Sequence, residues 1–424
     1  MLHRLKSGRG ALVAGVALAV FAIGSASAQD KGPIKIGFAQ SLTGFLSPNG
    51  KQALLGAEIW RDEINKSGGL LGRQVQLVYY DDKSAPQEVP GIYTKLLDID
   101  KVDLVVGGYA TNQNAPAMPV IIRKNKTYIS LFSLDVNAQF KYPKYFSILP
   151  TGQNTKGSFT EGFFDVAMAQ NPKPQTVALA MADAEFSQNA CEGARENAKK
   201  ANLKIVYDKA YPPPPKTTDF TPVVRALQAA NADLVVICSY PADSVGIVES
   251  ANEIGLKPKM FGGAMVGLQT TVFKDKLKGK LNGIVNYETW VPDEKEMYKG
   301  TKEFFAEYQK RAKEAGVDPL GYYLGGWGYA QFQILGDAVK GANSLDDNKI
   351  ADYLKKTSFE TIMGPIKFGA KGEWAQGRML QVQYHDIKPD ANLETWRGMS
   401  YQTVLTPKNL ATGKVVYPYE KAHQ

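Results

Sequence analysis

The chain has 424 residues, a formal net charge of +8 at pH 7 and two cysteines. Its basic residues are interleaved with acids and form no basic cluster with aromatic residues between them, which argues against a nucleic-acid-binding protein. Two cysteines are too few for a disulfide scaffold, and a chain of this length exceeds one hydrophobic core, so we expect two lobes.

The first 28 residues predict a cleavable signal peptide. Basic residues precede the apolar run ALVAGVALAVFAIG, which is short for a membrane-spanning helix, and Ala26 and Ala28 form a signal-peptidase site. No cysteine follows this site to carry a lipid anchor. We therefore expect cleavage after Ala28 and a soluble periplasmic protein that begins at Gln29.

Strands and helices alternate along the first half of the mature chain. The hydrophobic pattern predicts strands at 34–40, 74–82 and 102–108, with helices at 51–66 and 86–100 between them. The glycines of SGGLLGR follow a helix, so they mark a helix end and not a dinucleotide-binding loop. Alternation without tight hairpin turns is typical of parallel βαβ units.

The same order returns in the second half. A strand at 174–183, a helix at 189–201, a strand at 203–211 and a helix with a third strand at 220–240 follow one another. The stretches LVYYDD and VDLVV of the first half correspond to IVYDKA and ADLVV of the second half. This repetition predicts an α/β protein with two similar lobes, each a doubly wound parallel sheet.

Ligands of such sheets bind at the carboxyl ends of the strands. Several segments of this chain lie at predicted strand ends, where they should face one another across a cleft between the lobes. They are AQSLTG (39–44), GGYATNQNAP (107–116), ISLFSLD (129–135), MADAEFS (181–187), CSYPAD (238–243) and FGGAMVG (261–267).

The sequence lacks the residues of a catalytic or metal site. His3 precedes the cleavage site and His423 is the second-last residue, which leaves His385 as the one histidine inside the domain. No GxxxxGK[ST], HExxH or CxxC motif is present. The adjacent Asp81 and Asp82 are expected to form a solvated turn. We therefore expect binding without chemistry, with no metal and no cofactor.

The two cysteines, Cys191 and Cys238, fall in the second half of the chain. They are able to pair in an oxidising compartment. Because the sequence gives no geometry for such a bond, we expect two separately buried thiols.

The mature chain resembles the periplasmic binding proteins for leucine, isoleucine and valine. The resemblance covers nearly all of the mature chain, through IKIGFAQSLTGFLSPNGKQALLGAEIWRDEINKSGGLLGRQVQLVYYDD, VVGGYATNQNAPAMPV, ADLVVICSY and MGPIKFGAKGE. It implies two lobes joined by three crossovers, which form a three-stranded hinge beside the ligand cleft. It also implies closure of the lobes on the ligand and delivery to the permease subunits of an ABC importer.

The resemblance also suggests boundaries for the two lobes. We expect residues 29–149 with 285–358 to form the first lobe and residues 150–284 with 359–400 to form the second. Residues 401–424 are expected to be a C-terminal tail. We expect a monomer.

In that family, the loops after the third and fourth strands hold the ligand's carboxylate with hydroxyls and backbone N–H groups. These positions fall on Thr111, with Ala110 and Asn112 beside it, and on Ser133. The positive end of a helix dipole and its unpaired N–H groups favour an anion at such a place. Tyr240 matches a family tyrosine that contacts the ligand.

Further residues of the cleft loops complete the predicted site. They comprise an acid, a methionine and several aromatic residues, which would enclose a ring of the ligand. They are Tyr109, Phe132, Phe45, Phe186, Asp183 and Met265. Met265 stands where amino-acid binders of the family place the acid that receives the ligand's ammonium, and no carboxylate lies from Met260 to Lys274. The cystine of the family's first lobe is also missing, since Ser84 and Ala110 stand nearest to its positions. These departures predict an aromatic carboxylate without an α-amino group, of the benzoate or phenylpropanoid type.

Two other interpretations stay open. The chain could bind a branched-chain amino acid or an amide, with Asp183, Glu185 or Asp243 replacing the missing acid. It could also be a sensory ligand-binding protein that docks on a membrane receptor.

Overall fold

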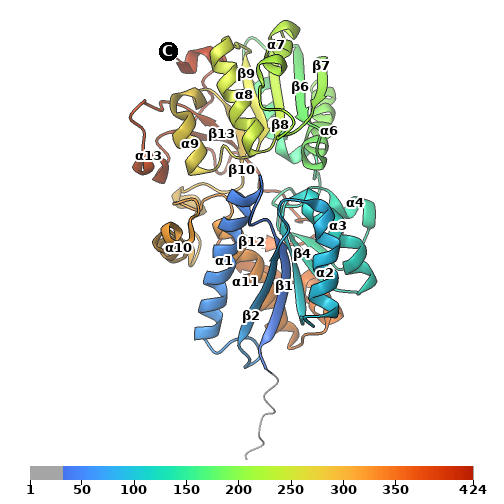
Figure 1. The fold of residues 1–424 in the computed structure, drawn as a ribbon. Coiled ribbons are helices and arrows are strands. Elements are labelled where there is room, and N and C mark those ends of the chain that lie inside the picture. Colours follow the sequence, from blue (N-terminus) through green and yellow to red (C-terminus); the bar gives the residue numbers. More distant parts are fainter. Residues whose placement is uncertain (1–31, 424) are drawn as a thin grey trace, which may run out of the picture. The chain divides into compact units, whose positions relative to one another are not determined.

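The computed structural model describes residues 32–423, so the predicted signal peptide, residues 1–28, lies outside the described residues. Two β-sheets with helices on their faces build the fold (Figure 1). None of the helices in the described range combines the length and the apolar composition that a membrane crossing requires.

The first sheet has five parallel strands in the order β2-β1-β3-β4-β5. They are β1 (Ile34–Gln40), β2 (Val75–Asp81), β3 (Leu104–Tyr109), β4 (Tyr128–Leu131) and β5 (Tyr145–Ser147). Successive side chains of a strand point to opposite faces. One face therefore packs on α1 (Ser47–Lys66) and α11 (Gly325–Ala342), and the other packs on α2 (Val89–Asp98) and α3 (Thr111–Arg123).

The second sheet has seven strands in the order β14-β13-β10-β9-β8-β6-β7. They are β6 (Thr176–Ala182), β7 (Lys204–Tyr211), β8 (Leu234–Ser239), β9 (Met260–Met265), β10 (Val285–Glu288), β13 (Leu380–Tyr384) and β14 (Gln402–Thr406). The strands β6 to β10 run parallel, whereas β13 and β14 add antiparallel partners at one edge. One face of this sheet packs on α6 (Glu185–Lys200), and the other packs on α7 (Thr221–Ala230) and α8 (Pro241–Ile254).

The remaining elements are further helices and one hairpin. The α-helices are α4 (Val136–Phe140), α5 (Glu161–Met168), α9 (Thr271–Leu277), α10 (Thr301–Ala315), α12 (Asp347–Lys356) and α13 (Leu393–Arg397). The 3-10 helices are η1 (Pro86–Glu88), η2 (Gly157–Phe159), η3 (Lys278–Leu281), η4 (Glu294–Glu296) and η5 (Tyr419–His423). The hairpin joins β11 (Ser358–Thr361) to β12 (Gly364–Lys367).

The chain passes between the two sheets three times, as the resemblance implied. The first passage follows β5, the second leads from β10 to the helices that pack on α1, and the third leads from β12 to β13. The predicted α/β fold of two doubly wound lobes is therefore confirmed. We call the second and third passages, residues 289–300 and 368–379, the crossover segments.

Two expected lobe boundaries differ from the observed strand pairing. The prediction placed residues 285–288 in the first lobe, but β10 pairs with β9 and β13 in the second sheet. Residues 402–406 were expected in a C-terminal tail, but they form β14 at the edge of the same sheet. Both differences arise because pairing between distant segments, and not the local pattern, decides where these strands belong.

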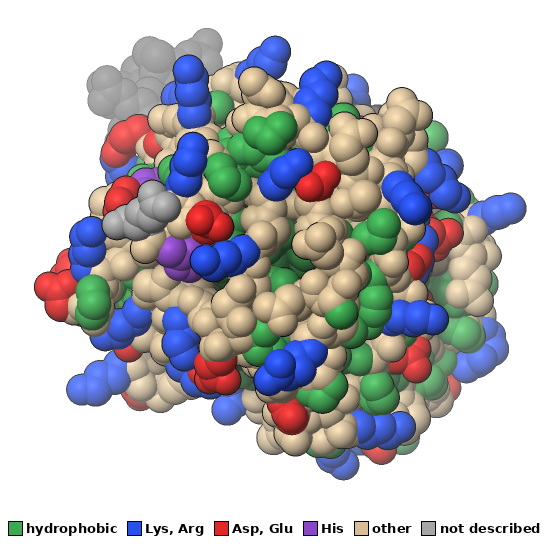
Figure 2. Space-filling model, turned by 90° about the horizontal axis from the view of Figure 1, so that it is seen from above, with side chains coloured by type: hydrophobic (Ala, Val, Ile, Leu, Met, Phe, Trp, Pro, Cys, Tyr) green, Lys and Arg blue, Asp and Glu red, His purple; other side chains and the backbone are tan. Residues whose placement is uncertain are grey.

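The charged side chains of the surface are dispersed. On the face shown in Figure 2, Lys and Arg side chains are scattered, with Asp, Glu and uncharged residues between them. This distribution differs from the basic stripe that is typical of a nucleic-acid-binding surface.

The expectation of two separate thiols is wrong, because Cys191 and Cys238 form a disulfide with 5.9 Å between their Cα atoms. Alternation along β8 points Cys238 to the face that α6 covers, and Cys191 is on the side of α6 that packs against this face. Both cysteines are fully buried. The bond therefore joins a helix to the middle of the sheet beneath it.

Replacing both cysteines by alanine should lower the free energy of unfolding by about 2–4 kcal/mol, because the unfolded chain loses a cross-link that restricts its conformations. Denaturant unfolding followed by far-UV circular dichroism measures the change. Thiol titration of the denatured, unreduced wild-type protein is the control. Two reactive thiols per chain in that titration would contradict the bond.

Candidate ligand-binding cleft

The turn between β3 and α3 forms one wall of the cleft. Ala110 has a φ of +84°, which is unusual for a residue with a side chain. The side-chain amide of Asn114 holds this turn, because it donates to the carbonyl oxygens of Gly108 (2.7 Å) and Ala110 (2.8 Å). The helix α3 then begins at Thr111, so its unpaired N–H groups and the positive end of its dipole lie at the cleft.

The loop after β4 lies beside this turn. The Thr111 hydroxyl accepts a hydrogen bond from the backbone N–H of Leu134 at 2.9 Å, which joins the two loops. Phe132 and Asp135 have φ angles of +51° and +61°, so two non-glycine residues of this loop adopt the left-handed conformation. Such backbone strain is concentrated at functional sites.

Residues from the second sheet approach the same place. Tyr240 directly precedes α8, and its hydroxyl donates to the side-chain oxygen of Asn112 at 2.9 Å. The same oxygen accepts a 3.4 Å hydrogen bond from the N–H of Phe186 in the first turn of α6. The rings of Phe186 and Tyr240 lie 5.5 Å apart. Asn112 therefore connects the first lobe to two helix starts of the second.

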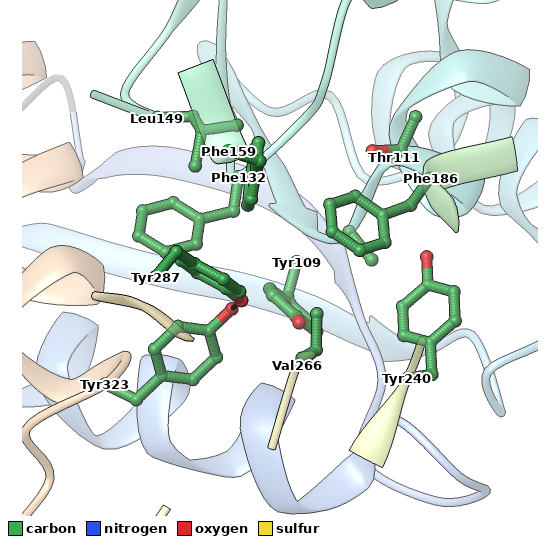
Figure 3. A pocket seen from close by; sticks show the side chains of 11 residues that line it. Tyr109, Thr111, Phe132, Leu149, Phe159, Phe186, Tyr240, Val266, Tyr287 and Tyr323 are labelled. Carbon is green, nitrogen blue, oxygen red and sulfur yellow. Dashed lines mark hydrogen bonds between the residues drawn. The ribbon is translucent and has the colours of Figure 1, made fainter. Parts of the chain in front are cut away.

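Together these loops enclose a cavity of mostly aromatic walls (Figure 3). Its lining consists of Tyr109, Ala110, Thr111, Phe132, Leu149, Phe159, Phe186, Tyr240, Val266, Tyr287 and Tyr323. Within the described chain, no charged side chain belongs to this lining. The free space is about 10 Å³, which is about the room that one water molecule needs. A larger ligand therefore enters when the walls separate or the rings rotate.

Tyrosine hydroxyls supply most of the polar side-chain groups of the cavity. The hydroxyls of Tyr287 and Tyr323 are 2.9 Å apart, and that of Tyr109 accepts a 3.0 Å hydrogen bond from the side-chain amide of Asn49. Burial raises the pKa of Tyr109 to about 12 and that of Tyr287 well above its ordinary value. These phenols are therefore neutral at physiological pH, and each can donate or accept a hydrogen bond.

The structure brings six of the predicted site residues into the cavity lining. They are Tyr109, Ala110, Thr111, Phe132, Phe186 and Tyr240. Asn112 contacts the lining through Tyr240. Ser133 is fully buried, and its hydroxyl has no hydrogen-bond partner among the described residues.

Three other predicted site residues lie outside the lining. Phe45 is 42% exposed and meets the ring of Tyr240 at 5.8 Å. Asp183 is exposed and accepts a hydrogen bond from Gln188. Met265 packs in the core on the far face of the second sheet, because alternation along β9 places it with Phe261. Val266, one residue later, lines the cavity in its place.

Five lining residues are not predicted from the sequence: Leu149, Phe159, Val266, Tyr287 and Tyr323. Tyr287 and Val266 lie at the ends of strands, so the strand-end rule could have found them. Phe159 lies in η2 and Tyr323 in the turn before α11, where no local pattern marks a ligand site. Only the folding of distant segments onto the cleft places them there.

Comparison with known proteins identifies the family. Residues 33–388 match the family described as periplasmic binding protein, and the chain belongs to it. The Leu/Ile/Val-binding protein of Citrobacter freundii is 25% identical over 347 residues, which cover 80% of this chain and 88% of that protein. The resemblance seen in the sequence is thereby confirmed.

Two solved structures share the fold. The branched-chain amino acid transporter substrate binding protein of Streptococcus pneumoniae in complex with isoleucine has a TM-score of 0.70 at 22% identity, covering 88% of this chain and 100% of that chain. A solute binding protein of R. palustris in complex with 4-hydroxybenzoate has a TM-score of 0.71 at 18% identity, covering 84% of this chain and 94% of that chain. At these identities the likeness shows the fold alone.

The acids that could replace Met265 as an ammonium partner lie outside the cavity lining: Asp183, Glu185 and Asp243. Asp243 is fully buried in the first turn of α8, and its Oδ2 accepts a 2.7 Å hydrogen bond from the Tyr211 hydroxyl on β7. Burial raises the pKa of the Asp243 carboxyl to about 7, and the hydrogen bond from Tyr211 opposes this only in part. The folded state therefore keeps a proton that an unfolded aspartate releases near pH 3.8.

Because the folded state binds more protons between these two pH values, stability should fall as the pH rises through this window. The side chain of the variant Asp243→Asn cannot ionise. Between about pH 4.5 and about pH 8, its free energy of unfolding should therefore fall less than that of wild type, and the difference should be on the order of 1–4 kcal/mol. Denaturant unfolding at a series of pH values measures this. Asp275→Asn, an exposed position in α9, is the matched control and should keep the wild-type slope. If the free energy of unfolding depends on pH equally in Asp243→Asn and in wild type, this carboxyl is not the source of the pH dependence.

Proposed function

We propose that this protein is the periplasmic solute-binding protein of an ABC importer for a small aromatic carboxylate. The proposal rests on the cavity, which is lined by seven aromatic residues and, within the described chain, by no charged side chain. In this proposal the two lobes close on the acid and present it to the permease subunits. Its family and the transporter proteins that share its fold support the transport class.

The absence of a carboxylate from the described lining argues against an α-amino acid as the ligand. Such a ligand brings an ammonium into a closed cleft, where an unpaired charge costs several kcal/mol. A carboxylate has partners there, because α3 begins at the cavity and its first N–H groups and dipole favour an anion. The Thr111 hydroxyl lies at this helix start.

The aromatic walls favour a planar ring over an aliphatic chain. Rings of Phe159 and Tyr287 lie 4.7 Å apart, and rings of Phe132 and Tyr323 lie 5.7 Å apart, in edge-to-face arrangements that a ligand ring can join. The neighbouring hydroxyls of Tyr287 and Tyr323 would pair with a hydroxyl on the ring of the ligand. A hydroxylated benzoate or cinnamate therefore uses both the anion-favouring and the phenolic parts of the cavity.

A second candidate is a branched-chain amino acid. The Leu/Ile/Val-binding protein of Citrobacter freundii is among the relatives of this chain, which favours this candidate. It requires an ammonium partner from outside the described lining, so the aromatic carboxylate is the better match to the cavity.

Calorimetry should show binding of 4-hydroxybenzoate or 4-hydroxycinnamate and no comparable binding of leucine or phenylalanine. The amide of the acid that binds should be much weaker, since the charge-assisted part of the interaction is lost. Tight leucine binding without any binding of the deaminated acids would overturn the proposed ligand class while leaving the transport class intact.

The variant Thr111→Val removes a hydroxyl at nearly constant volume and should weaken binding of the acid by about 1–3 kcal/mol. Thr111→Ser keeps the hydroxyl and is the matched control. Because this hydroxyl also accepts from Leu134, the thermal unfolding of each variant must be compared in the absence of the ligand. If the valine variant binds both the acid and its amide as wild type does, Thr111 does not hold the carboxylate.

A further inference from the structure

Asn112 is among the residues predicted to bind the ligand, but its side chain has other partners in the structure. It lies outside the cavity lining, in the first turn of α3 in the first lobe. Its side-chain oxygen accepts two hydrogen bonds from the second lobe, one from the Tyr240 hydroxyl at 2.9 Å and one from the N–H of Phe186 at 3.4 Å. One oxygen atom therefore joins the two lobes at two points.

The first of these points is the start of α6, which has no cap of its own. Its N-cap residue is Ala184, whose side chain accepts no hydrogen bond from the first turn. The first N–H groups of a helix need acceptors from outside the helix, and the side-chain oxygen of an asparagine is among the most effective. Asn112 supplies this acceptor from the other lobe. Separation of the lobes therefore leaves this end of α6 to water.

The second point is Tyr240, which the first lobe contacts at both its ring and its hydroxyl. Its ring meets that of Phe45, in the turn between β1 and α1, edge to face at 5.8 Å. Burial raises the pKa of Tyr240 well above its ordinary value, so the hydroxyl keeps its proton and donates to Asn112. The same ring forms part of the cavity wall beside Phe186 (Figure 3). Tyr240 therefore connects the cavity to the surface where the lobes meet.

Another polar contact between the lobes lies nearer to solvent. Lys156, in the first passage between the sheets, pairs with Asp135 of the first lobe at 3.5 Å and with Glu192 of α6 at 2.6 Å. The side chain of Glu192 is 51% exposed, and ion pairs at such exposure contribute little. Tyr240 is only 3% exposed, so its hydrogen bond to Asn112 is shielded from competing water.

We propose that Asn112 is a latch that holds the two lobes closed, through Tyr240 and the start of α6, without binding the ligand itself. Its hydrogen bonds join protein atoms alone, so they favour the closed form before the ligand binds as well as afterwards. The inference rests on the proposed function only because it takes lobe closure as a step of binding, and it does not depend on the class of ligand. Asn112 is a positioning residue, since it acts through Tyr240 and α6.

X-ray scattering of the protein without ligand tests the latch. Asn112→Ala removes the acceptor, and Tyr240→Phe removes one donor while it keeps the ring. Both variants should have a larger radius of gyration than wild type. Because both changes break the same hydrogen bond, the double variant should be no larger than Asn112→Ala alone.

Two further variants serve as controls in the same measurement. Asn112→Asp keeps an oxygen acceptor at the start of α6 and should stay as compact as wild type. Gln188→Ala changes an exposed residue of α6 whose amide donates to Asp183 within the same lobe, and it should also leave the radius unchanged.

Stopped-flow fluorescence with 4-hydroxybenzoate measures the same contact in the bound form. Asn112→Ala and Tyr240→Phe should raise the dissociation rate about tenfold and leave the association rate within about twofold of wild type, because the latch forms after the ligand has entered. A general structural defect would lower the association rate or the fraction of protein that binds.

Equal radii of gyration for wild type and both variants without ligand would overturn the latch. An unchanged dissociation rate in both variants would overturn it as well. If 4-hydroxybenzoate does not bind wild type, the proposed ligand class fails, and the scattering measurement still decides the latch. If Asn112→Ala does not fold, Tyr240→Phe gives the answer, since it removes only a hydroxyl.

Discussion

Parallel pairing of strands is the constraint on which the binding cleft depends. Parallel strands place their carboxyl ends at one edge of a sheet, and the helices that follow must begin there. In this protein β3 leads into α3, β6 into α6 and β8 into α8, with one or two residues between strand and helix. The residues at these junctions, Thr111, Phe186 and Tyr240, line one cavity. The polarity of the cleft is therefore set by the backbone before any side chain contributes.

The side chains then determine which ligand the cleft can accept. Because no charged side chain of the described residues lines the cavity, helix ends and neutral hydroxyls are the groups available to stabilise a charge. This arrangement suits a single negative charge and leaves a positive one without a partner. The aromatic rings fill nearly all of the remaining space, so selectivity depends on how well a ligand replaces contacts among these rings.

Much of the fold and about half of the predicted site could be derived from the sequence. Residues 34–40 form the predicted strand, and the loops at strand ends contain Tyr109, Thr111, Phe186 and Tyr240. These features are encoded locally, by hydrophobic periodicity and by turns. Met265 was assigned by its position in a loop, whereas alternation along β9 turns it into the core and brings Val266 to the cavity.

Other features depended on packing between distant segments. Tyr323 reaches the cavity from a turn before α11, and β14 joins the second sheet from a segment expected to be a tail. The lining of a second cavity combines Glu296 of one crossover segment with Trp374 and Arg378 of the other. No periodicity or spacing in the sequence indicates that these residues meet, because each segment alone has an ordinary composition.

The disulfide makes the stability of the second lobe depend on the compartment in which the chain folds. A reducing environment keeps Cys191 and Cys238 as thiols, whereas an oxidising one joins them. The bond joins α6, whose first turn carries Phe186, to β8, which Tyr240 directly follows. Oxidation therefore fixes the two elements that hold this pair of rings in the cleft. A chain kept in a reducing environment would lack this cross-link and would unfold more easily than the oxidised protein.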